Sequence, residues 1–337
     1  MKTCNKARLP VITKSANNLL KILFEAMVLI HHLSIFSGFL GNTVTGILGP
    51  VGVCGFLFCS GYGVGENYKV KGFDFSKKLL LKKVPRFYFV IIITNAFYLI
   101  AYLINGNSFE SVFSAVGAVL NLHAISGVPR LSHWLYFIND LMIYYIMFFL
   151  ASYLFRKREN TLLPSAIFIL TLQTVIIVIL TIINEKTGNS MSLRGCILFP
   201  LGLLTSYYNN KIVNFLKNFK GVLIFGLLSV GILFLTLFDH LIFNEYITSA
   251  LFALSVCASV FKLNLKSKGL NFAGKLVIYV YLSHEFFWKT FNNLMPSLSH
   301  ELIIVLTLIL TISVSLIINL VVETLKKLKT KKIIVAI

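Results

Sequence analysis

The chain has 337 residues, of which 57% are hydrophobic and 13% are charged, and its formal net charge is +19. Soluble domains carry about 25% charged residues, so this composition excludes a soluble globular protein and indicates an integral membrane protein. Nucleic-acid binding is not needed to explain the positive charge, because Lys and Arg are concentrated in alternate connections between apolar segments.

Apolar segments recur along the whole chain, most of them close to the roughly 20 residues that cross a membrane. They lie near residues 17–39, 47–66, 85–105, 132–155, 162–183, 194–209, 221–239, 244–262, 271–290 and 301–324. This pattern predicts an all-α, polytopic membrane protein with about ten transmembrane helices in one bundle. Basic connections mark the cytoplasmic side, which predicts cytoplasmic termini and a multi-pass protein of the cell inner (plasma) membrane.

We expect a single integral-membrane domain over residues 1–337, with basic cytoplasmic tails at 1–16 and 325–337. No repeat of fixed period is present, which disfavours an inverted-repeat transporter. The five cysteines are scattered and have no CxxC or His-linked spacing, so we predict neither a disulfide nor a metal site.

The first apolar segment contains three ionisable residues that share one face of a helix. At about 100° per residue, Lys21, Glu25 and His32 fall within about 40° of one another, whereas His31 lies about 80° from Lys21 and outside this face. Charged groups in a membrane normally face a polar cavity, which makes His32 a candidate general base and Glu25 a candidate catalytic carboxylate. The alternative is structural: Lys21 reaches the interface, Glu25 pairs with it, and His32 bonds to another helix.

The second and third segments offer candidates for binding a phosphorylated cytosolic ligand. Ser60 and Tyr62 lie in the glycine-rich run 49–68, whose glycines equally suit close helix packing. The basic run 77–86 includes Lys83 and Arg86; a guanidinium binds phosphate in bidentate fashion, although such a run is more commonly a topology signal.

Three further candidates lie in the fourth and ninth segments. Trp134 belongs to an aromatic belt at the expected outer interface, and Asp140 lies one to one and a half turns deeper. His284 lies late in the ninth segment, toward the expected outer side. We assign these three residues to acceptor binding; the alternative for Asp140 is a structural partner of a buried cation.

Several of these stretches together resemble one family. Lys21 and His32, separated by ten residues and followed by Leu33, are similar to the first-helix signature of the integral-membrane acyltransferase 3 family. The run 55–64 resembles its second-helix pattern, and the basic run ending at Arg86, the segment 134–145 and the run 281–284 follow in the expected order. Lys21 stands where Arg is frequent, Glu25 replaces an apolar position, and Pro85 precedes Arg86 instead of following it.

The resemblance implies a bundle that moves an acyl group, usually acetyl, from cytosolic acyl-CoA to a hydroxyl of an extracytoplasmic polysaccharide or lipid-linked glycan. It implies His32 as the catalytic residue, acting either as a general base or by carrying a transient acyl group. It assigns Arg86 to the donor-side basic motif, and we expect Lys21, Lys83, Ser60 and Tyr62 to contribute to donor binding as well. Acyl-CoA is then a substrate, with no permanently bound cofactor, and membrane lipids are the other expected partners.

The main alternative is a proton-coupled transporter or flippase of a glycan or lipid, in which Lys21, Glu25 and His32 would relay protons. The missing repeats count against it. A membrane scaffold without activity gives no reason for the charged face.

Overall fold

A computed structural model of the chain describes residues 13–37, 42–104, 106–122, 131, 136–187, 197–209, 211–212, 245–261, 265–295 and 297–335. All regular elements in these ranges are helices, which confirms the predicted all-α class. They are α1 (Lys14–Ser37), α2 (Asn42–Lys71), α3 (Phe73–Lys78), the π-helical turn η1 (Leu79–Lys83), α4 (Val84–Ile104), α5 (Val112–Val119), α7 (Tyr136–Leu154), α8 (Leu162–Thr187), α9 (Leu198–Tyr207), α12 (Glu245–Phe261), α13 (Lys268–Leu294) and α14 (His300–Val335).

Five of the described helical stretches are long and apolar enough to cross a membrane: Lys14–Ile35, Ile47–Lys71, Phe73–Ile104, Phe137–Leu154 and His300–Thr324. Shorter apolar helices cover Leu162–Ile176, Leu198–Tyr207 and Ser249–Phe261. The ninth predicted span corresponds to α13, whereas the seventh, 221–239, lies outside the described residues. A membrane protein is therefore supported, and the count of ten spans stays a prediction.

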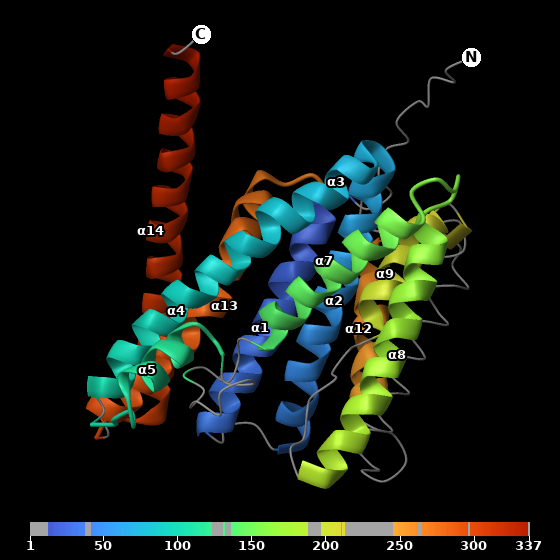
Figure 1. The fold of residues 1–337 in the computed structure, drawn as a ribbon. Helices are drawn as coiled ribbons and strands as arrows, with labels where there is room; N and C mark the ends of the chain where they lie inside the picture. The colour runs from blue at the N-terminus through green and yellow to red at the C-terminus, as the bar shows by residue number, and fades with distance from the viewer. Residues whose placement is uncertain are drawn as a thin grey trace.

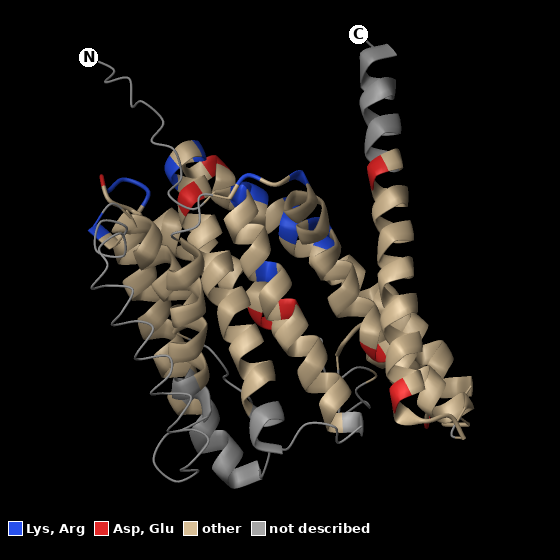
Figure 2. Ribbon diagram, turned by 180° about the vertical axis from the view of Figure 1, so that it is seen from behind, with Lys and Arg blue, Asp and Glu red and all other residues tan. Residues whose placement is uncertain are grey.

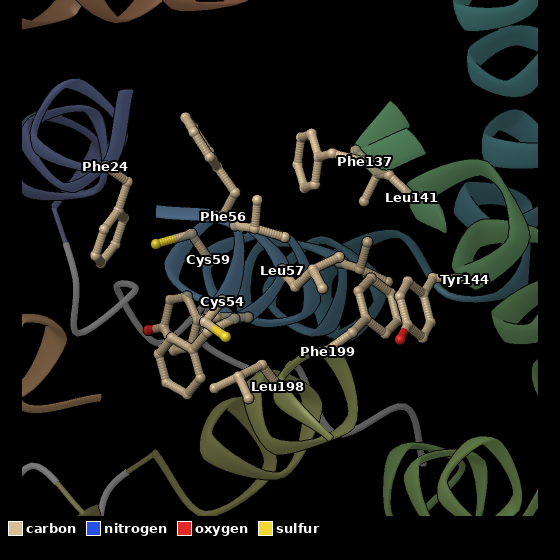
Figure 3. Packing of buried hydrophobic residues seen from close by; sticks show 14 of the residues in the cluster. Phe24, Cys54, Phe56, Leu57, Cys59, Phe137, Leu141, Tyr144, Leu198 and Phe199 are labelled. Atoms are coloured by element: carbon tan, nitrogen blue, oxygen red, sulfur yellow. The ribbon is translucent and has the colours of Figure 1, made fainter. Parts of the chain in front are cut away.

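Helix α2 lies inside the bundle, where it packs against α1, α9 and α12 (Figure 1). Close approach to α9 depends on Gly61, because a Cβ there would overlap the backbone oxygen of Phe199. Around this contact the apolar core is dense: Leu57 is fully buried, and the rings of Tyr144 and Phe199 stack with centroids 4.9 Å apart (Figure 3). The glycine-rich run of α2 therefore works as a helix-packing surface.

The positive charge is concentrated at one end of the bundle. Most of the Lys and Arg residues that the structure describes lie at the end where α1 begins and α14 finishes (Figure 2). Helix α14 continues unbroken to Val335, so its last turns extend away from the other helices (Figure 1). This distribution agrees with the alternating basic connections of the sequence, on which the predicted cytoplasmic side rests.

The connection after α4 turns back along that helix. Phe109 packs on Tyr102 with ring centroids 4.8 Å apart, close to the end of α4. Asn95, about two turns before Tyr102, donates to the carbonyls of Ala118 and Val119 at the end of α5, at 3.3 and 3.2 Å. Helix α5 therefore runs antiparallel to α4, and its closing carbonyls are satisfied by a buried side chain of α4.

Helices α1 and α13 run side by side in the same direction, and a series of hydrogen bonds fixes their register. Ser15 Oγ donates to the carbonyl of Ser267 at 3.3 Å, and Asn18 Nδ2 donates to Asn271 Oδ1 at 2.9 Å. The partners are 252 and 253 residues apart in sequence. Since both helices rise about 1.5 Å per residue, this constant offset brings matching positions together all along the pair.

Candidate active site

Two buried histidines meet across the interface between α1 and α13. His32 Nδ1 lies 2.6 Å from His284 Nε2, and the two rings stack with centroids 4.9 Å apart and an angle of 17° between their planes. Both side chains are almost completely buried. Their separation of 252 residues is the same offset that links Ser15 to Ser267, so the helix register described above brings them together.

The contacts of the pair indicate where its basic nitrogen lies. His284 Nδ1 is 3.2 Å from the carbonyl oxygen of Val280, an acceptor only, so this nitrogen donates. In the neutral ring His284 Nε2 is then the acceptor, and His32 Nδ1 donates to it. We make this assignment from the hydrogen-bond network. When both rings are neutral, it leaves His32 Nε2 as the nitrogen with a free lone pair, which can accept a proton.

Helical geometry shows which way the charged face of α1 points. Phe24, Val28 and His31 lie against Gly55, Gly52 and Gly49 of α2. Ser15 and Asn18 contact α13. At about 100° per residue, Lys21, Glu25 and His32 fall in the sector between these two contacts. The exposed Ala26 and Ile30 lie on the roughly opposite face, so the three ionisable residues point into the bundle and not toward lipid.

His31 has a different environment from its neighbour. Its ring covers Gly49 of α2 so closely that a Cβ at this glycine would overlap the imidazole. The two histidines are adjacent in sequence, with ring centroids 5.2 Å apart, but only His32 contacts His284. His31 therefore belongs to the α1–α2 packing interface.

The side chains of Lys21 and Glu25 are one turn apart but do not pair. Glu25 is 4% exposed, and neither of its carboxylate oxygens has a hydrogen-bond partner in the described part of the chain. Of the structural alternative, the pairing of Glu25 with Lys21 is therefore not present, whereas the bond of His32 to another helix is. Lys21 instead lies within electrostatic range of Cys59 in α2 and Lys83 in η1.

The three cations predicted to bind the donor, Lys21, Lys83 and Arg86, form a series of electrostatic neighbours. Lys21 and Lys83 are close enough for their charges to repel, and Lys83 has the same relationship with Arg86. Within the described residues none of the three forms an ion pair with a carboxylate. A group of unpaired cations that repel one another favours binding of an anion.

A tyrosine that the sequence analysis did not single out joins this group. The side chain of Tyr145 in α7 is hydrogen-bonded to Ser60, and the Nζ atom of Lys83 lies 5.1 Å from the centroid of its ring. Tyr145 is buried, whereas Lys83 and Arg86 are exposed. No spacing in the sequence links α2, η1 and α7 here, so only their packing could reveal this contact.

The remaining predicted residues lie elsewhere. Tyr62 packs on Phe261 of α12, with ring centroids 5.9 Å apart, because it is rotated about 200° from Ser60 on α2. Asp140 is half-buried in α7, and no hydrogen bond or ion pair joins it to either histidine. Trp134 lies outside the described residues.

An ion pair that was not predicted from the sequence lies next to His284. Glu285 is 2% exposed and forms an ion pair with Lys289 one turn later, at 2.6 Å. The Nζ atom of Lys289 also lies 5.8 Å from the ring centroid of Tyr98. The carboxylate beside His284 is thus neutralised within α13, and the i,i+4 spacing of Glu285 and Lys289 was a signal for it in the sequence.

Comparison with known proteins places this site in a family. The acyltransferase domain family matches residues 16–320, which include His32, His284 and the three cations. The chain belongs to the acyltransferase 3 family. Neither the curated proteins nor the solved structures contain a match to it. Membership confirms the resemblance drawn from the sequence and makes the protein a membrane acyltransferase.

Proposed function

We propose that this acyltransferase moves an acyl group, expected to be acetyl, from cytosolic acyl-CoA to a hydroxyl of a polysaccharide or lipid-linked glycan outside the inner membrane. The observation that carries the proposal is the contact between His32 and His284. It provides a buried base whose orientation is fixed by a second ring. Family membership supplies the reaction class.

The reaction follows from the position of the lone pair on His32 Nε2. This nitrogen takes the proton of the acceptor hydroxyl as the oxygen attacks the thioester carbonyl. The tetrahedral intermediate collapses, the carbon–sulfur bond breaks, and the CoA thiolate receives the same proton from His32. An ester and a free thiol result, and no net proton is gained or lost. His284 accepts the Nδ1–H of His32 throughout and so stabilises the imidazolium.

Donor binding is assigned to the cationic group of Lys21, Lys83 and Arg86, supported by the absence of carboxylate partners within the described residues. The phosphates of CoA would supply the missing negative charge, with Arg86 as the bidentate contact. Ser60, held by Tyr145, lies beside the same group. For the acceptor, Trp134 and Asp140 remain the proposed sugar contacts, since an aromatic ring and a carboxylate both suit a carbohydrate.

The proposal is tested by mass spectrometry of surface glycans from cells that lack the protein or carry one variant. His32→Ala should remove the ester-linked acyl group as fully as deletion does. His300→Ala is the matched control: this exposed histidine packs on Trp288 at the start of α14, and its removal should leave acylation unchanged. Full acylation in the His32→Ala strain would overturn the proposal.

The choice between general base and acyl carrier needs purified protein. Radiolabelled acetyl-CoA without acceptor should leave no label on a general base. Label that is trapped on wild-type protein by rapid quenching and is absent from His32→Ala would instead show a covalent acyl-imidazole.

A further inference from the structure

Glu25 is the one ionisable side chain of the α1 face to which neither the cationic group nor the histidine pair gives a role. It is 4% exposed, and both of its carboxylate oxygens lack a hydrogen-bond partner in the described residues. Neighbouring positions along the same helix are satisfied, since Asn18 pairs with Asn271 and His32 with His284. Burial of a carboxyl group without a donor is costly, which suggests that a ligand supplies one.

The position of Glu25 indicates which part of a ligand it meets. It lies four residues after Lys21 and seven before His32, which places it about 6 Å and about 10 Å from them along the helix axis. All three point into the same sector between α2 and α13. An acyl-CoA molecule whose phosphates bind at Lys21 and whose thioester reaches His32 must pass Glu25 on the way.

The chemistry argues against a proton relay through Glu25. In the proposed reaction the proton taken from the hydroxyl returns to the departing thiolate, so no proton has to leave the site. The connecting arm of CoA is a pantetheine chain with two amide groups, each of which has an N–H donor. A buried carboxyl group is an acceptor matched to such a donor.

We propose that Glu25 binds an amide N–H of the donor's pantetheine arm and so selects CoA-type thioesters over simple ones. The inference rests on the proposed function, because it presupposes acyl-CoA as the donor. Glu25 is then a donor-specificity residue and not a catalytic residue. The proposed contact needs the carbonyl oxygen of Glu25 as a hydrogen-bond acceptor. Glutamine has the same oxygen, so Glu25→Gln should keep part of the donor selectivity.

The test compares two donors with purified protein: acetyl-CoA, and ethyl thioacetate, whose alkyl arm has no amide. Glu25→Leu should lower kcat/KM for acetyl-CoA about ten- to hundredfold and leave kcat/KM for ethyl thioacetate unchanged. Glu25→Gln should recover most of the loss. Gln173→Leu in α8 is the matched control for removing a buried polar group, and it should affect neither donor.

Binding of pantetheine, followed by calorimetry, gives a second readout that does not depend on turnover. It should weaken in Glu25→Leu and recover in Glu25→Gln. Equal losses with both donors, or no recovery in Glu25→Gln, would overturn the inference. Wild-type protein that does not use acetyl-CoA at all would refute the proposed function itself, and so the two failures are distinguishable.

Discussion

His32 Nδ1 lies 2.6 Å from His284 Nε2 although the two residues are 252 positions apart. This contact joins the first helix of the bundle to one of its last, and the hydrogen bond between Asn18 and Asn271 holds the same register more than three turns away. The geometry of the proposed base therefore depends on how α1 and α13 align along their whole length.

The first prediction concerns the role of His284. His284→Leu should lower kcat about ten- to hundredfold, because it removes the ring nitrogen that accepts the Nδ1–H of His32. His284→Gln retains a side-chain oxygen acceptor and should keep more activity. The measurement is kcat and KM for acetyl transfer by purified protein. A large rise in the KM of the acceptor with unchanged kcat would instead support the substrate-binding role expected from the sequence.

A second prediction uses two glycines of α2 that differ only in their surroundings. Gly61→Ala should destabilise the protein strongly, because the new Cβ would overlap the backbone oxygen of Phe199, which cannot move aside as a flexible side chain would. Gly63→Ala meets no atom within 4 Å and should be tolerated or slightly stabilising. Thermal unfolding in detergent compares the two variants, and equal melting temperatures would contradict the α2–α9 packing described above.

The third prediction separates the cations of the proposed donor site. Lys83→Gln and Arg86→Lys should raise the KM for acetyl-CoA several-fold or more, because Lys83 lies within electrostatic range of both Lys21 and Arg86, and a point charge does not replace a planar guanidinium. Lys82→Gln should have a weak effect that is confined to low salt. Titration with acetyl-CoA at two salt concentrations measures this difference. Unchanged affinity in all three variants would reduce the basic run to a topology signal.

The fourth prediction concerns the orientation in the membrane. A cysteine in place of Asn107, which follows α4, should react with an impermeant maleimide in intact cells, whereas a cysteine in place of Lys157, which follows α7, should react only after lysis. Both positions are exposed, and the native Cys54, Cys59 and Cys257 are buried, so they should contribute little background. Labelling of the Lys157 position from outside would reverse the predicted topology.

The sequence was sufficient for features that depend on local geometry. The common face of Lys21, Glu25 and His32 requires only the helical period, and the structure makes this segment a continuous helix, α1. The all-α class follows in the same way, from the length of the apolar segments. These properties are set within about 25 residues and do not depend on the packing of other helices.

Features that depend on the register between helices could not be read in this way. Ser60 and Tyr62 are equivalent candidates in the sequence, yet packing turns Ser60 toward Tyr145 and Tyr62 toward Phe261. Likewise, nothing local to His284 indicates that it meets His32, because the offset between α1 and α13 is fixed by their full set of contacts. In the same way, no local pattern predicts that Asn95 donates to the carbonyls of Ala118 and Val119 and so holds the end of α5 against α4.

The alignment of α1 with α13 also has a consequence for biosynthesis. At about 5–20 residues per second, α13 leaves the ribosome on the order of ten to fifty seconds after α1. During this interval α1 must be inserted with Lys21 and Glu25 at membrane depth and without His284, the partner of His32 in α13. Helix α2, through the contact of Phe24 with Gly55, is the first helix available to shelter α1. A chain interrupted before residue 268 would retain His32 yet never assemble the histidine pair.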